Sequence, residues 1–178
     1  LELSSGALVW QRKLGTGADP ATRDPARRPE PRGFCAPADP LVRGLRHVLR
    51  GIKERGLEHI SSGTTLLAKA TRAATVALGL KVYPSDPVDS VTAMVVPQGV
   101  DESKLRKTMR EKYGFQIAGG QGELKGKIIR FSHMGYVDAF DTIAVIAALE
   151  MTLAGQGYKF ASGVGVAAAT KVFTESMK

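Results

Sequence analysis

The sequence predicts an α+β fold, in which a small, largely antiparallel sheet is covered by helices on one face and preceded by a disordered N-terminal tail. Apolar residues recur at helical spacing in several segments after residue 40, which predicts amphipathic helices. Short runs rich in β-branched residues lie between these segments and predict strands. The link between the last two runs is too short for a crossover, so we expect those strands to be antiparallel neighbours. This arrangement is typical of helices packed on one face of a sheet.

Residues 1–40 are expected to form a disordered tail rich in proline and arginine, and residues 41–178 to form one folded domain. The tail holds six of the nine prolines and shows neither a period of 2 nor one of 3.6. Proline removes a backbone donor and interrupts regular elements. The single cysteine, Cys35, lies in this tail, where we interpret it as a free thiol and not as a nucleophile.

The domain is predicted to begin with two helices. The first, over 41–60, has apolar residues at helical spacing. Ser61-Ser62-Gly63 is expected to interrupt the pattern, and Thr64 or Thr65 to cap a second helix that stops at Gly79. The residues expected to share the apolar face of the second helix are Leu67, Ala70, Ala74 and Leu78.

A strand over 91–96 and a third helix follow. Asp101 is a good N-cap for this helix and Gly114 is expected to close it. Glu102 and Arg106 lie one turn apart on the helix, a spacing at which opposite charges pair.

Two more short strands, over 115–118 and 127–132, flank a glycine-rich loop. Asp138, with Asp141 three residues on, is placed to begin a fourth helix, where acidic groups suit the helix dipole. Residues 163–176 form a weakly helical segment rich in small side chains. The apolar stripe expected on the fourth helix consists of Phe140, Ala144, Ala147, Ala148 and Met151.

Bulk composition narrows the class of protein. The hydrophobic fraction is 43% and the charged fraction 24%, as in ordinary soluble domains. No apolar run approaches the roughly 20 residues of a membrane helix, and one cysteine with three histidines shows no zinc-ligand spacing. We therefore expect a cytoplasmic protein without a metal site or a membrane partner. The net charge of +8 suits an acidic ligand or nucleic acid, and equally a solvated basic face.

The glycine-rich loop and the strand after it form the most site-like segment. Arg130 on this strand would present a rigid fork suited to a carboxylate or phosphate, or would form a structural ion pair. His133 is interpreted as a turn residue hydrogen-bonded to the backbone. The loop over 119–126 lacks the Lys-Ser/Thr ending of a P-loop, so we interpret it as a hairpin loop and not as a phosphate cradle.

An ordered series of short motifs resembles the small C-terminal domain of class V aminotransferases, closest to the alanine–glyoxylate and serine–glyoxylate branch. Ile129-Arg130-Phe131-Ser132-His133-Met134-Gly135 is the most specific of them. The resemblance covers roughly residues 41–175. The other motifs lie at 57–60, 66–74, 78–81, 97–100, 111–114 and 119–122.

The resemblance implies an enzyme that uses pyridoxal phosphate to move an amino group from alanine or serine to glyoxylate, and that forms a homodimer. In that family, the arginine matching Arg130 clamps the α-carboxylate of the small amino-acid or 2-oxo-acid substrate. The lysine that carries the cofactor lies in a large domain, in a Ser/Gln-Lys-Gly context that no lysine of this chain has. We therefore expect no catalytic residue here and no activity from this chain alone.

The alternative hypothesis is a basic α+β binding module for an acidic ligand or nucleic acid. Its candidate surface is the third predicted helix, which carries many basic side chains. A single aromatic residue, Tyr113, offers little platform for base stacking, so nucleic acid is the weaker expectation.

Overall fold

The structure, a computed structural model, describes residues 39–176. The chain divides into two compact units, residues 1–45 and residues 46–178. The disorder expected for residues 1–40 falls outside the described residues, apart from the last two residues of that range, because the first helix, α1, already begins at Asp39.

Two helices open the described chain, α1 over Asp39–Arg55 and α2 over Leu57–Ala77. The predicted interruption at Ser61-Ser62-Gly63 is wrong, because α2 runs through these residues. The Ser62 hydroxyl donates to the carbonyl of His59 at 2.9 Å, so this polar side chain is satisfied within the helix. The break comes instead at Gly56, whose φ of 82° lies in the left-handed region that favours glycine.

The far end of α2 matches the prediction. Helix α2 ends just before Gly79, which has a φ of 72°. The four residues predicted to share its apolar face, Leu67, Ala70, Ala74 and Leu78, are all buried.

Three strands form an antiparallel sheet in the order β1-β3-β2, as the fold class predicted. Strand β1 spans Val91–Val95, β2 Ala118–Gly119 and β3 Ile128–Ser132. Strand β2 is shorter and later than the predicted 115–118, because Phe115 donates its backbone N–H to the carbonyl of Met109 and so still belongs to the end of the preceding helix.

The remaining helices are α3 (Glu102–Tyr113), α4 (Ala139–Gly155) and α5 (Val164–Ser176). The predicted caps of α3 and α4 are confirmed. The Asp101 carboxylate accepts from the N–H of Lys104, and Asp138 and Asp141 form a capping box at the start of α4.

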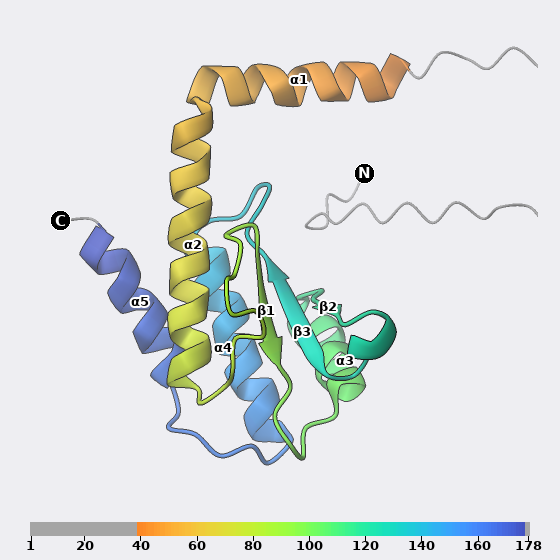
Figure 1. Ribbon diagram of the computed structural model, residues 1–178, viewed down its shortest axis with the longest axis vertical. Helices are drawn as coiled ribbons and strands as arrows, with labels where there is room; N and C mark the ends of the chain where they lie inside the picture. The colour runs from red at the N-terminus through yellow and green to blue at the C-terminus, as the bar shows by residue number, and fades with distance from the viewer. Residues whose placement is uncertain (1–38, 177–178) are drawn as a thin grey trace, which may run out of the picture. The chain divides into compact units, whose positions relative to one another are not determined.

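The main core lies between the sheet and helices α3 and α4, which Figure 1 shows behind the strands. Side chains of β1 and β3 on this face meet apolar residues of both helices. The buried members include Met94, Leu105, Met109, Ile129, Phe131, Leu149 and Leu153.

The predicted apolar stripe of α4 is wrong for most of its members: Ala148 is buried in the core as expected, but three of the other four are exposed. Phe140 is 80% exposed and Met151 51% exposed, whereas Ile146 and Leu149 are each 1% exposed. Helix α4 is apolar over most of its circumference, so hydrophobic spacing alone does not distinguish the face that packs. No helix among residues 39–176 combines the length and apolar character needed to cross a membrane.

Helix α5 is attached to α4 through a buried carboxylate. Glu150 is 7% exposed, and its side chain accepts from the backbone N–H groups of Gly163 (2.7 Å), Gly165 (2.7 Å) and Val166 (3.1 Å). These donors lie at the beginning of α5, where backbone N–H groups have no partner within the helix. The Glu150 carboxylate of α4 therefore supplies hydrogen-bond acceptors for the free backbone N–H groups at the N-terminus of α5.

Candidate functional site

Arg130 lies in the middle of the central strand. In the register of the sheet it faces Ala93 of β1 on one side and Ala118 of β2 on the other. Successive side chains of a strand point to opposite faces, so Arg130 lies on the face away from the core residues Ile129 and Phe131. Its side chain is half-buried, and small neighbours on both flanking strands leave room around it.

The guanidinium of Arg130 is held by the backbone of the neighbouring strand. Its Nε–H donates to the carbonyl oxygen of Gly119 at 3.0 Å. Among residues 39–176, no acidic side chain forms an ion pair with Arg130, so the structural ion pair left open by the sequence is not found there. The arginine fork is thus oriented through one nitrogen, and its two terminal nitrogens remain for an oxyanion.

Gly119 occupies a position where a side chain has no room. A Cβ there would overlap the carboxylate of Glu102 and would lie 2.9 Å from Nε of Arg106. Glu102 is buried and pairs with Arg106 one helical turn on, as the spacing predicted. The Glu102–Arg106 pair of α3 therefore packs against one side of Gly119, while the carbonyl of Gly119 orients Arg130.

The glycine-rich segment forms a hairpin loop, as expected. It joins the antiparallel strands β2 and β3 and contains a short 3₁₀ turn over Gly122–Leu124. At Gly120 a Cβ would overlap the carbonyl oxygen of Leu124, so the tight path of the loop requires glycine there.

His133, at the end of β3, is buried at 4% exposure. Its Nε2 lies 2.8 Å from the hydroxyl of Thr92, and its backbone N–H donates to the carbonyl of Ser90. His133 makes a backbone hydrogen bond as expected, but it is not part of a turn, and its side chain bonds a threonine hydroxyl. Burial lowers the pKa of His133 to about 4, and the positive charge of Arg72 acts in the same direction.

A polar cluster that sequence reasoning missed lies beside His133. The Asp89 carboxylate accepts from the guanidinium of Arg72 at 2.6 Å and from the hydroxyl of Thr65 at 2.7 Å. These two hydrogen bonds hold the pKa of Asp89 below its usual value. The partners lie 17 and 24 residues from Asp89, and no sequence motif links them. The cluster ties α2 to the loop before β1 and so fixes the end of the sheet that carries His133.

The described residues do not fit a covalently held pyridoxal phosphate. Every lysine among residues 40–176 is exposed. A lysine that forms a Schiff base is activated by desolvation or by a nearby cation in a pocket, and an exposed ammonium lacks that environment. In the same part of the chain, no group of three His, Cys, Asp or Glu side chains could hold a metal ion.

Comparison with known proteins identifies the class. The chain is 35% identical over 155 residues to serine–glyoxylate aminotransferase of Methylorubrum extorquens, covering 84% of this chain and 39% of the relative. The crystal structure of pyridoxamine–pyruvate aminotransferase from Mesorhizobium loti superposes with a TM-score of 0.76 at 34% identity, covering 79% of this chain and 37% of that one. No protein-family model matches the chain.

The chain is therefore homologous over most of its length to part of the class V aminotransferases, as the motif series indicated, and spans 39% of the length of the serine–glyoxylate relative. A further relative is described as the small subunit of a soluble hydrogenase from a Synechococcus strain. It is 40% identical over 155 residues, with 85% of this chain and 39% of the relative covered. The same region of sequence thus occurs in longer proteins that carry different descriptions.

Proposed function

We propose that this chain forms the substrate-side domain of a pyridoxal-phosphate aminotransferase that moves an amino group from alanine or serine to glyoxylate. In this role, residues 41–178 correspond to the small C-terminal domain, and Arg130 binds the α-carboxylate of the amino-acid or 2-oxo-acid substrate. The observation that carries the proposal is the Arg130 guanidinium, which is oriented by Gly119 and has no acidic partner among the described residues.

A carboxylate site of this kind suits transamination because the reaction needs a fixed substrate. A bidentate arginine holds the carboxylate, and thereby the Cα–H bond, in one orientation for proton transfer. When bound, the cofactor supplies the electron sink for that step. Every lysine among residues 40–176 is exposed, and on this ground the proposal assigns cofactor binding to a large domain and predicts no activity for this chain alone.

A domain exchange tests the proposal. The segment of Methylorubrum extorquens serine–glyoxylate aminotransferase that aligns with this chain is replaced by this chain's residues, and serine–glyoxylate turnover is measured together with cofactor absorbance. We expect a chimaera that binds cofactor and transaminates, whereas this chain incubated with pyridoxal phosphate gives no product above the cofactor-only blank. A chimaera with full cofactor occupancy and no turnover would contradict the proposal, as would turnover by the chain alone.

The second candidate function, a basic module for an acidic ligand, is favoured by one separate observation. Three cationic side chains of α3 line a hollow that is distinct from the Arg130 face.

A further inference from the structure

A hollow of about 260 Å³ lies between α3 and the segment that leads into β2. It is smaller than the roughly 300–1,000 Å³ of pockets that take drug-sized ligands, so its size suits a single compact group. No acidic side chain is among the residues that line it, which are Ser103, Arg106, Lys107, Arg110, Gln116 and Ile117.

The hollow and Arg130 lie on opposite faces of the sheet. Gly119 is in register with Ile129, and its α-carbon contacts the Glu102–Arg106 pair on the side covered by α3. Arg130, one residue after Ile129, points to the other face. The hollow is therefore separate from the surface that carries the proposed substrate-binding arginine.

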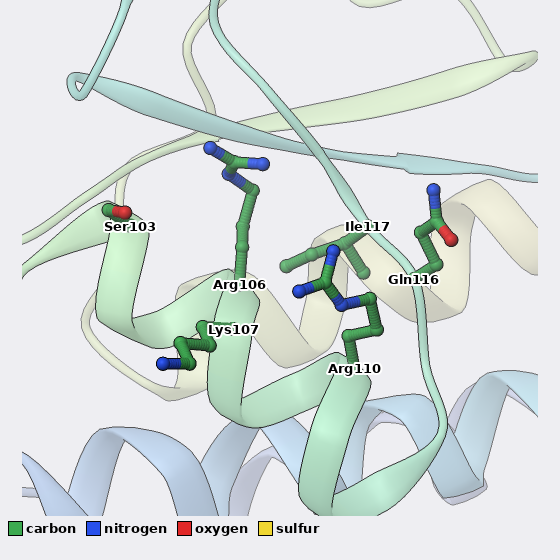
Figure 2. A pocket seen from close by; sticks show the side chains of 6 residues that line it. All are labelled: Ser103, Arg106, Lys107, Arg110, Gln116 and Ile117. Carbon is green, nitrogen blue, oxygen red and sulfur yellow. The ribbon is translucent and has the colours of Figure 1, made fainter.

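Two guanidinium-bearing side chains line the hollow. Arg106 and Arg110 are four residues apart, so they lie on the same side of α3. Figure 2 shows the Arg106 side chain rising from α3 toward the strands and the Arg110 side chain rising from the next turn beside Ile117, whereas Lys107 points to the side.

The two arginines are held differently. Arg106 is anchored by the buried carboxylate of Glu102, which engages its Nε and, at 3.4 Å, one terminal nitrogen. Arg110 pairs with Glu111 at 3.1 Å, but both side chains are more than half exposed, and exposed pairs of this kind contribute little. The guanidinium of Arg106 is thus fixed in position by Glu102. The guanidinium of Arg110 can exchange its exposed partner, Glu111, for a ligand.

Neutral polar side chains complete the lining of the hollow. Two neutral polar side chains, Ser103 and Gln116, border the hollow, and both are exposed to solvent. Two guanidinium forks with additional neutral donors match the several oxygens of a doubly charged phosphate group. We propose that this hollow binds the phosphate group of a small phosphorylated ligand, with Arg106 and Arg110 as its principal contacts.

The full chain is titrated with inorganic pyrophosphate at about 0.15 M salt, which screens the non-specific attraction of a basic surface. Binding is followed by calorimetry and by the NMR signals of the Ile117 backbone amide and the Gln116 side-chain amide. We expect saturable binding with shifts confined to the hollow. The variant Arg110→Gln should weaken binding about tenfold, as expected for loss of a charge-assisted hydrogen bond.

Lys104→Gln is the matched control, because it removes the same charge from an exposed position of α3 that does not line the hollow. It should leave the affinity within about twofold, since a screened distant charge contributes little. Equal weakening in both variants, shifts spread over the whole surface, or no saturation would overturn the proposal. Displacement of pyrophosphate by a single-stranded oligonucleotide that also shifts signals along the length of α3 would overturn it in favour of nucleic-acid binding.

Discussion

The Nε–H of Arg130 donates to the carbonyl oxygen of Gly119 at 3.0 Å, across two neighbouring antiparallel strands. This hydrogen bond places the guanidinium beside the hairpin loop, on the face of the sheet opposite the core. The residue that orients the proposed substrate-binding arginine is thus a glycine whose α-carbon contacts the side chains of Glu102 and Arg106.

Gly119→Ala is expected to destabilise the domain by about 1–3 kcal/mol, the usual cost of overpacking, because the new methyl group would overlap the buried Glu102 carboxylate. The free energy of unfolding is measured by urea denaturation. Gly63→Ala is the control: nothing lies within 4 Å of a Cβ there, and the position is inside α2. It should stabilise the domain by about 0.5–1 kcal/mol. Equal stability of the two variants would show that Gly119 does not need to be glycine.

Glu150→Gln is expected to reduce the free energy of unfolding by about 2 kcal/mol, because the buried carboxylate accepts three backbone N–H groups at the start of α5. The amide keeps the shape but has only one acceptor oxygen. Amide hydrogen exchange should show the loss concentrated in α5. The control, Glu175→Gln, changes an exposed side chain near the end of the same helix. An effect no larger than that of the control would mean that Glu150 does not stabilise α5.

The stability of the domain should fall as the pH is lowered from about 6.5 to about 4. The pKa of His133 is about 4 in the folded protein, whereas an unperturbed histidine has a pKa of 6.5. Between these two values His133 is protonated in the unfolded chain and neutral in the folded one, so acid favours the unfolded chain. Below pH 4 this contribution is constant. The lowered pKa of Asp89 adds a further loss there, as its carboxylate is protonated.

Urea midpoints measured between pH 4 and pH 8 check this expectation. His133→Asn should flatten the profile between about pH 4 and 6.5, whatever its own stability, because the titrating group is gone. An unchanged slope in His133→Asn would assign the acid loss to other groups.

The sequence predicted a largely antiparallel sheet, the antiparallel pairing of its last two strands and most helix ends; the helix ends were predictable because caps and glycine stops are local signals. Asp101 and Asp138, as N-cap residues, each predict the start of a helix to within a few residues. The face of α4 was predicted wrongly because that helix is apolar nearly all round, so only the position of the sheet decides that Ile146 is buried and Met151 is not.

The candidate site likewise has features that the local sequence predicts and features that only tertiary packing determines. Arg130 stands out in the sequence because it is a single cation in an apolar strand after a glycine-rich loop. The support of its guanidinium by Gly119, and the packing of Glu102 and Arg106 against that glycine, depend on strand register and on the placement of α3. The cluster around Asp89 joins residues from three separate segments, and no local pattern predicts such contacts.

The most direct test of the central claim is the effect of Arg130→Ala in the chimaera with the Methylorubrum extorquens enzyme. Cofactor absorbance reports occupancy, and kcat/KM for serine reports use of the amino acid. We predict that occupancy stays unchanged while kcat/KM falls by the equivalent of roughly 2–5 kcal/mol, as for breaking one partner of a desolvated charge pair. Arg130→Lys should recover only part of the loss, because lysine lacks the planar fork. A kcat/KM within about twofold of the parent would contradict the assignment of Arg130 as the carboxylate-binding residue.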